Sequence, residues 1–84
     1  MYEVRWSDVS RKQLDKVEST IAKRIVDKVE SIVDSPFRFV KRLKGFDLYS
    51  LRVGNYRVIM SIEGNKMIIF VLEVGHRSSI YKKY

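Results

Sequence analysis

The spacing of hydrophobic residues predicts a short strand followed by two helices in the first part of the chain. Residues 2–6 alternate in polarity, which is typical of a strand. Ser7 and Asp8 then provide an N-cap and a first-turn acid for a helix that we expect to reach about Glu18. A second helix is expected from about Ser19, because its apolar residues recur every three or four positions and form one stripe. The stripe consists of Ile21, Ala22, Ile25, Val26, Val29, Ile32 and Val33.

The second part of the chain is expected to form three strands after a basic connector at residues 37–46. Pro36 ends the second helix, since proline disfavours the helical conformation in the residue before it. The strands are expected at residues 48–53, 56–63 and 66–74. The links Gly54-Asn55 and Gly64-Asn65 predict two-residue hairpins, because glycine and asparagine accept positive φ. The resulting order, β-α-α-β-β-β, predicts an α+β fold with two helices on a mostly antiparallel four-stranded sheet, followed by a short C-terminal segment.

Composition limits the class of protein. The 84 residues leave room for one modest core, so we expect a single domain over residues 1–84. The chain has no cysteine, which excludes a disulfide and is typical of a reducing compartment. With one histidine it also lacks the usual ligands of a structural zinc site, and we expect no metal or other cofactor. No apolar run is long enough for a signal peptide or a membrane span, which predicts a soluble cytoplasmic protein.

The positive charge of the chain is confined to its second part. The formal net charge is +7. Residues 1–35 hold seven Lys or Arg and seven Asp or Glu, whereas residues 36–84 hold ten Lys or Arg and three acids. Any net charge favours solubility, but this segregation favours a basic face for a polyanion such as RNA. A membrane surface is the weaker candidate, because no helix combines a basic face with aromatic anchors.

Two arginines are expected to lie side by side near the end of the sheet. If Gly54-Asn55 is a two-residue loop, Arg52 pairs with Arg57 on the same face of the hairpin. Like charges directly opposite each other destabilise a sheet, and no acid is available beside this pair. Either an anion fills the site, or both side chains extend into water at little cost.

The second hairpin is expected to bring further polar residues to the same end of the sheet. If Gly64-Asn65 is also a two-residue loop, Tyr56 lies opposite Glu73, and the third strand ends beside the first turn. The chain that leaves this strand then carries three more polar side chains to the arginine pair: His76, Arg77 and Tyr81. Arginine suits a phosphodiester, because its planar fork matches two phosphate oxygens and stays charged.

In two stretches the chain resembles the RelE-type toxins of the RelE/ParE superfamily: LYSLRVGNYRVI at residues 48–59 and VGHRSSIY at residues 74–81. The resemblance extends over nearly the whole chain. It implies a metal-independent endoribonuclease that cuts messenger RNA in the ribosomal A site, and a RelB-like antitoxin that silences it. Two alternatives stay open, namely a ParE-like inhibitor of DNA gyrase with the same fold and an RNA- or ribosome-binding module without activity.

The resemblance also implies roles for individual residues. Arg57 and Arg77 match the family arginines that stabilise the phosphate in the transition state, and Tyr81 matches a tyrosine proposed as general base. Arg52 stands where relatives carry lysine or arginine. In this chemistry the 2′-hydroxyl of the RNA is the nucleophile, so the protein has to position the phosphate, offset its charge and manage two proton transfers.

The identity of the general base stays open at this point. Ser50 stands where the best-known bacterial members have a lysine, and the interval from Gly75 to Tyr81 is shorter than theirs. His76 is a second candidate, because histidine titrates near neutral pH, and Tyr84 is a third. The competing interpretations are that His76 is a turn residue bonded to the backbone, and that Tyr81 only packs under the C-terminus.

The basic connector supplies a second group of candidate residues. Lys41, Arg42 and Lys44 lie outside the proposed catalytic end, so we expect them to contact the RNA backbone.

Overall fold

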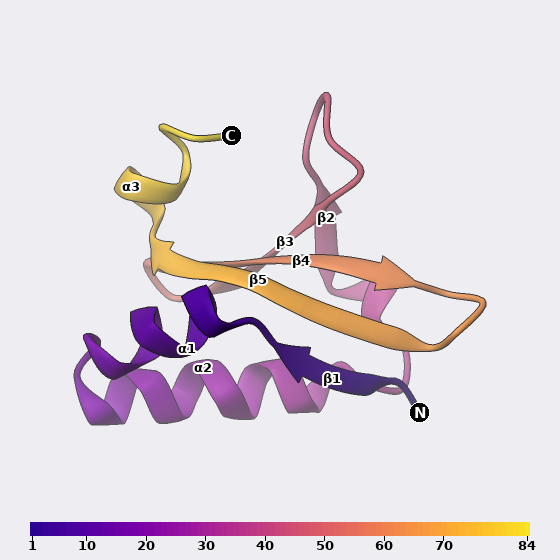
Figure 1. Ribbon diagram of the computed structural model, residues 1–84, viewed down its shortest axis with the longest axis horizontal. Coiled ribbons are helices and arrows are strands. Elements are labelled where there is room, and N and C mark those ends of the chain that lie inside the picture. Colours follow the sequence, from indigo (N-terminus) through magenta and orange to yellow (C-terminus); the bar gives the residue numbers. More distant parts are fainter.

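Five strands form one mixed sheet in the computed structural model, which describes residues 1–84 (Figure 1). The elements are β1 (Glu3–Trp6), α1 (Asp8–Asp15), α2 (Ser19–Ser31), a 3₁₀ turn (Pro36–Arg38), β2 (Val40–Arg42), β3 (Tyr49–Val53), β4 (Tyr56–Glu63), β5 (Ile68–His76) and α3 (Arg77–Ile80). The strand order is β1-β5-β4-β3-β2. β1 is parallel to β5, and the other neighbours are antiparallel.

The predicted α+β class is confirmed, but the prediction of four strands is wrong. The fifth strand, β2, lies inside the segment that we expected to be a connector, where Val40 pairs with Leu51 and Lys41 with Ser50. One apolar and two basic residues give no alternation long enough to recognise. The strand exists because the edge of β3 is available to pair with it, and that edge is distant in sequence.

α1 and α2 cover one face of the sheet, as the purple helices of Figure 1 show. Ser7 caps α1 as predicted, since its hydroxyl accepts a hydrogen bond from the backbone N–H of Ser10 at 3.0 Å. The stripe of α2 buries Ile25 and Val29 completely, although the helix ends at Ser31, before the last two stripe residues. No helix of the structure has the length and apolar character needed to cross a membrane.

The first hairpin has the predicted register, and the second does not. Arg52 pairs with Arg57 across the turn at Gly54-Asn55, where Gly54 has a φ of +59° that favours glycine. The second loop has four residues, 64–67, between the paired Glu63 and Ile68. A register shift between Ile59 and Met60 displaces the pairing further.

These two differences move β5 relative to β4. Tyr56 lies opposite His76, and not opposite Glu73 as predicted, so that Arg57 lies opposite Gly75. β5 still ends beside the first turn, as predicted. The backbone N–H of Arg77, directly after β5, donates to the carbonyl of Asn55 in that turn at 2.8 Å.

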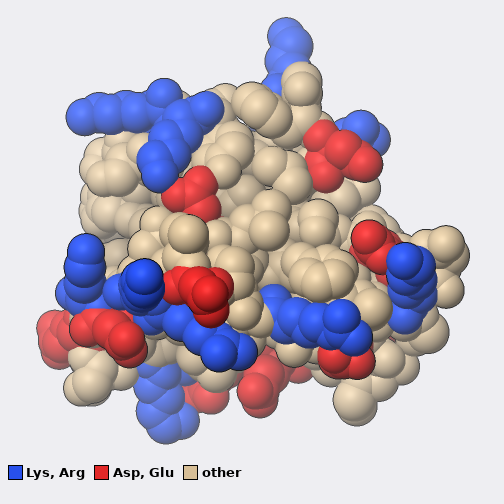
Figure 2. Space-filling model, viewed as in Figure 1, with Lys and Arg blue, Asp and Glu red and all other residues tan.

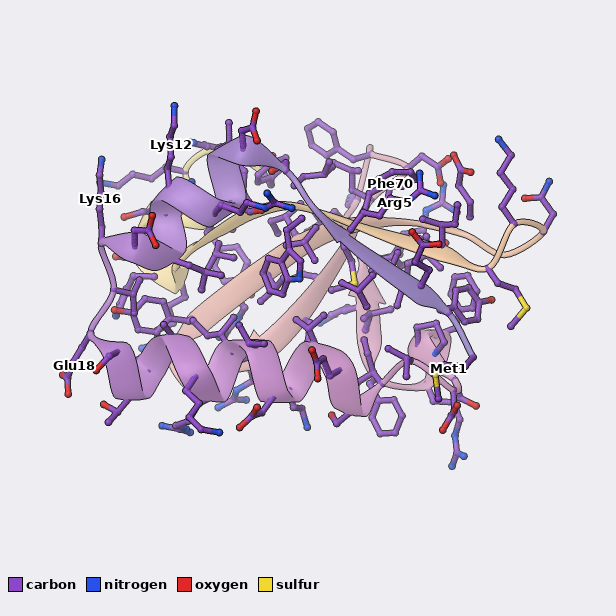
Figure 3. All side chains as sticks on the ribbon, turned by 60° about the horizontal axis from the view of Figure 1, so that its bottom comes forward. Met1, Arg5, Lys12, Lys16, Glu18 and Phe70 are labelled. Carbon is purple, nitrogen blue, oxygen red and sulfur yellow. The ribbon has the colours of Figure 1, made fainter.

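The free edge of β1 is charged. Arg5 donates to Glu3 at 2.6 Å, and its guanidinium lies over the ring of Phe70, 5.7 Å from the ring centroid (Figure 3). Charged side chains on an edge strand discourage pairing with other chains.

Candidate active site

The candidate residues lie mostly on the outer face of the sheet, which is the face turned away from α1 and α2. Val58 and Met60 belong to the core under the helices. Because side chains alternate along a strand, Arg57 and Ile59 point to the outer face. Arg52 lies opposite Arg57, and therefore shares this face. The segment that contains α3 rises on the same side of the sheet (Figure 1).

Arg57 is held in place by the turn beside it. Its side chain is not splayed into water, because the residue is only 7% exposed. Nη1 donates to the carbonyls of Gly54 and Tyr56, both at 2.9 Å, and Nε donates to the hydroxyl of Tyr81 at 2.9 Å. The partial negative charges of these three oxygens offset the positive charge that Arg57 places opposite Arg52. Nη2 makes no hydrogen bond within the protein and reaches the surface, so it remains free for a ligand.

Tyr81 reaches Arg57 because α3 is packed closely on β5. Ile80 is 2% exposed and lies against Gly75, where an added Cβ would come within 3.1 Å of the Ile80 side chain. This close approach favours glycine at position 75, because the Ile80 side chain would have to shift by a few tenths of an ångström to admit a Cβ. The Tyr81 ring is 53% exposed, and its centroid lies 5.6 Å from Cζ of Arg57. The structure thus brings together the predicted phosphate ligand and the predicted base.

Arg52 and Arg77 add exposed positive charge around this pair. Arg77 begins α3, and its carbonyl accepts from the N–H of Tyr81 at 3.1 Å, so the two residues are one helical turn apart. Neither arginine forms an ion pair. Figure 2 shows Lys and Arg side chains projecting at the upper left, over the C-terminal segment, while basic and acidic side chains mix below, around α1 and α2.

His76 does not join this group. It pairs with Tyr56, whose side chain packs toward the core, so His76 lies on the face opposite to Arg57. The two rings meet edge to face at 5.7 Å. Nδ1 of His76 accepts from the backbone N–H of Ser78 at 3.2 Å and caps α3. This is the local bonding role that we considered as the alternative.

Tyr84 is poorly suited to act as a base. Its hydroxyl donates to Oε2 of Glu73 at 2.5 Å. Burial and this hydrogen bond raise the pKa of Tyr84 to about 12. Glu73 itself was not foreseen, because the predicted register placed it opposite Tyr56, and no local pattern distinguishes it from a solvated acid.

The three basic residues of the connector are not equivalent. Lys41 lies opposite Ser50, on the outer face that carries Arg52 and Arg57, and it is exposed. Arg42 lies on the other face and forms an ion pair with Asp47 at 3.7 Å. Lys44 is exposed in the loop between β2 and β3. Of the three, Lys41 is best placed to extend the cationic surface.

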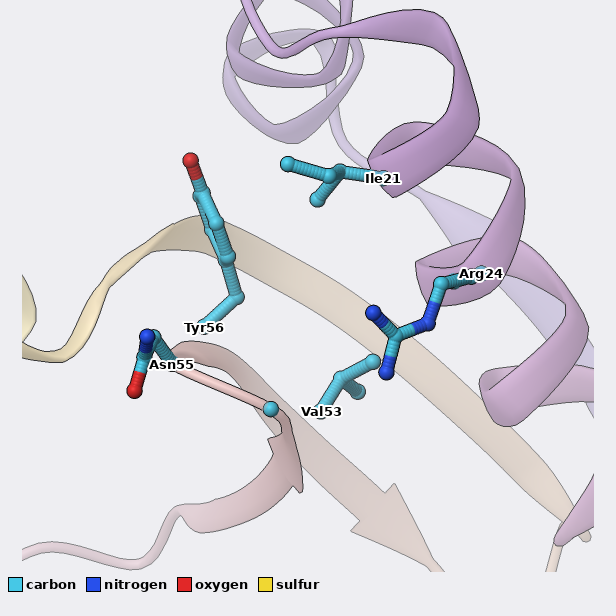
Figure 4. Close-up of a pocket in the computed structure, with 6 residues that line it drawn as sticks. Ile21, Arg24, Val53, Asn55 and Tyr56 are labelled. Atoms are coloured by element: carbon cyan, nitrogen blue, oxygen red, sulfur yellow. The ribbon is translucent and has the colours of Figure 1, made fainter.

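A small cavity of about 120 Å³ lies on the helix side of the same hairpin turn (Figure 4). Its lining residues are Ile21, Arg24, Val53, Gly54, Asn55 and Tyr56. The guanidinium of Arg24 points to the turn, with Nη2 3.7 Å from the position of a Cβ on Gly54. Arg24 is an exposed residue of α2. In the structure it adds a cation at the end of the sheet where Arg57 lies.

The chemistry available at the site is that of cations and hydroxyl groups. The Arg57 and Arg77 guanidinium groups can bind phosphate oxygens in a fixed geometry, and the Tyr81 hydroxyl can exchange a proton. No group of three or more His, Asp or Glu side chains lies close enough together to hold a metal ion.

The α+β fold and a cationic outer face with a tyrosine are the features expected of a small RelE-like toxin. The chain belongs to the ParE toxin family of type II toxin-antitoxin systems, whose family model matches residues 4–81. This confirms the resemblance to the RelE/ParE superfamily.

Individual relatives are similar over most of their length. The mRNA interferase toxin RelE of Escherichia coli K12 is 28% identical over 98% of this chain and 92% of its own. A chain of the RelBE2 toxin-antitoxin complex of Mycobacterium tuberculosis superimposes with a TM-score of 0.82 and 28% identity, covering 90% of this chain and 98% of its own. A chain of the RelB-RelE complex of Methanococcus jannaschii has a TM-score of 0.74 and 30% identity, covering 95% and 98%.

Proposed function

We propose that this toxin is a ribosome-dependent endoribonuclease that cuts messenger RNA in the A site without a metal ion. The observation that carries the proposal is the Arg57–Tyr81 hydrogen bond on the outer face, flanked by the exposed Arg52 and Arg77. The E. coli relative, which matches nearly the whole chain, is an mRNA interferase by name.

In this proposal the RNA supplies the nucleophile and the protein supplies charge and a proton acceptor. The Tyr81 hydroxyl, as its phenolate, takes the proton of the 2′-hydroxyl, whose oxygen attacks the adjacent phosphorus. Nη2 of Arg57 and the guanidinium of Arg77 stabilise the charge that develops on the non-bridging oxygens. The bond to the 5′-oxygen breaks, and that oxygen takes a proton from water, leaving a 2′,3′-cyclic phosphate and a 5′-hydroxyl.

The partners follow from the same reasoning. Lys41 and Lys44 are assigned to backbone contacts with messenger or ribosomal RNA, with Lys41 the strongest contributor, whereas Arg42 lies on the other face in its ion pair with Asp47. A cognate RelB-like antitoxin is the expected inhibitor, since similar chains occur in RelB-RelE complexes. Residues 1–84 act as one cytoplasmic domain.

The test combines the purified protein with translating ribosomes and maps the 5′ ends of the message. We expect cuts within the codon in the A site, and their loss in Arg77→Ala, which changes an exposed residue and leaves the core intact. A message that stays whole under these conditions contradicts the proposal.

A second candidate function is inhibition of DNA gyrase, which is favoured by the description of the matching family as ParE toxins. A supercoiling assay with the same protein separates the two functions. Inhibited gyrase with an intact message supports the ParE-like function. Ribosome binding without either effect supports a module that has lost activity.

A further inference from the structure

Glu73 is an acid on the cationic outer face, and its carboxylate is fully engaged. Oε1 accepts from Nζ of Lys83 at 2.7 Å and from Nε2 of Gln13 at 3.3 Å, while Oε2 accepts from the hydroxyl of Tyr84 at 2.5 Å. The side chain is only 14% exposed. An acid beside a surface that binds a polyanion weakens binding. Here its charge is offset by Lys83, and its hydrogen bonds fasten the end of the chain to β5.

The position of Glu73 is fixed by α1. β1 ends at Trp6, opposite Val71, so beyond that point this edge of β5 pairs with no strand. The Gln13 side chain occupies this edge, and its Oε1 accepts from the backbone N–H of Val74 at 2.6 Å. The same amide donates to Glu73 through Nε2. The carboxylate is therefore fixed to a helix and a strand of the main fold.

Residues 77–84, which we call the C-terminal strap, have two anchors with Tyr81 between them. The first is Ile80, which is buried against Gly75. The second is the Lys83 and Tyr84 pair on Glu73, supported by an edge-to-face contact of 5.3 Å between the rings of Tyr84 and Phe46. A half-exposed side chain between two anchors loses orientation when one of them is released.

We propose that Glu73 is a positioning residue, which fastens the C-terminal strap across the outer face so that the Tyr81 hydroxyl stays on Nε of Arg57. The inference rests on the proposed RNA-cutting function, because only a reaction that uses Tyr81 needs this orientation. Glu73 does not touch the substrate. It acts through Lys83 and Tyr84 on a hydroxyl that must be placed within a fraction of an ångström for efficient chemistry.

The test compares Glu73→Ala with Glu63→Ala in the full chain. Glu63 is a matched control, since it is also a β-strand glutamate paired with a lysine, Lys66 at 3.7 Å, but it lies at the far end of β4. The first readout is the ¹⁵N-resolved NMR signal of the Arg57 Nε–H, assigned by its loss in Arg57→Lys. A hydrogen bond to Tyr81 protects this proton from exchange with water. The second readout is single-turnover cleavage of a short RNA programmed in the ribosomal A site, over a range of concentrations of that programmed RNA.

We expect Glu73→Ala to broaden or remove the Arg57 Nε–H signal, as Tyr81→Phe does, while Glu63→Ala leaves it sharp. The maximal rate should fall about tenfold to a hundredfold in Glu73→Ala, with the RNA concentration for half-maximal rate nearly unchanged. Glu73→Gln retains one acceptor oxygen for Lys83, and its amide N–H can donate to the Tyr84 hydroxyl, so it should restore part of the signal and of the rate.

The outcomes separate this inference from the proposed function. A sharp Arg57 signal and a parental rate in Glu73→Ala overturn the positioning role and leave RNA cleavage standing. A parent protein that does not cut RNA on ribosomes overturns the proposed function. The NMR comparison then still decides whether Glu73 orients Tyr81.

Discussion

Replacing Tyr81 with phenylalanine removes one oxygen from the site and leaves the ring. The hydroxyl accepts the hydrogen bond from Nε of Arg57 at 2.9 Å. The ring lies 5.6 Å from the guanidinium, and this contact is retained in Tyr81→Phe. The substitution therefore tests the hydroxyl alone, with little change in packing.

The expected magnitudes distinguish a catalytic hydroxyl from an orienting one. A hydrogen bond to a charged group stabilises a protein by about 1.5–3 kcal/mol. With Tyr81 53% exposed, we expect a loss of about 1 kcal/mol, which corresponds to less than about tenfold in rate if only the alignment of Arg57 suffers. Loss of a general base costs about a hundredfold or more, equivalent to about 2.7 kcal/mol.

The assay is single-turnover cleavage of a short RNA in the ribosomal A site across pH, with His76→Gln as the comparison. His76 caps α3 on the other face, so His76→Gln should lower stability by about 0.5–1 kcal/mol and change the rate by only a few-fold. Three results together refute this reasoning. The rate falls less than tenfold in Tyr81→Phe, it falls further in His76→Gln, and the rate of the parent titrates near neutral pH. Near-parental rates for both variants show that neither residue is the base.

Three further predictions concern the surroundings of this pair. Gly75→Ala places a Cβ 3.1 Å from the buried isoleucine of α3, so it should shift the C-terminal strap and slow RNA cleavage at least severalfold, with the parent rate in the same assay as reference. Lys41→Gln should weaken ribosome binding and flatten its salt dependence by about one phosphate contact. Arg42→Gln, on the opposite face, should change neither the affinity nor the salt dependence. Titrations at several salt concentrations test this, and equal effects of the two variants contradict the assignment of these residues to different faces. The hydrogen bond from Lys83 lowers the pKa of Glu73, so the stability that Glu73 contributes is present above the ordinary carboxyl pKa and is lost as pH falls through the lowered value. Between pH 7 and pH 3 the denaturation midpoint of the parent should therefore fall further than that of Glu73→Gln, and parallel curves contradict the linkage.

The features that could be predicted from the sequence are those with local causes. The turn at Gly54-Asn55 requires positive φ, and its two-residue length fixed the pairing of Arg52 with Arg57. The stripe of α2 and the Ser7 cap also depend on near neighbours in sequence.

The features that were missed depend on distant contacts. The second loop uses Met67 at a φ of 54°, a conformation that no residue preference indicates for methionine, and the register shift at Ile59 arises only once β4 and β5 are paired. The register shift decides which face His76 occupies, because a shift of one residue reverses the alternation of faces, whereas the longer loop moves the pairing by two residues and keeps it. β2 and the bonds of Glu73 likewise require partners from other parts of the chain.

The end groups of the cut message test the central claim most directly. Attack by the 2′-hydroxyl, with Arg57, Arg77 and Tyr81 acting on the phosphate, leaves a 2′,3′-cyclic phosphate on the upstream fragment and a 5′-hydroxyl on the downstream one. We therefore expect fragments from ribosomes treated with the parent protein to carry these ends at the A-site codon, and short RNA cut in EDTA at high enzyme concentration to carry the same ends. Fragments with 5′-phosphate and 3′-hydroxyl ends, or an uncut message beside inhibited gyrase, contradict the account.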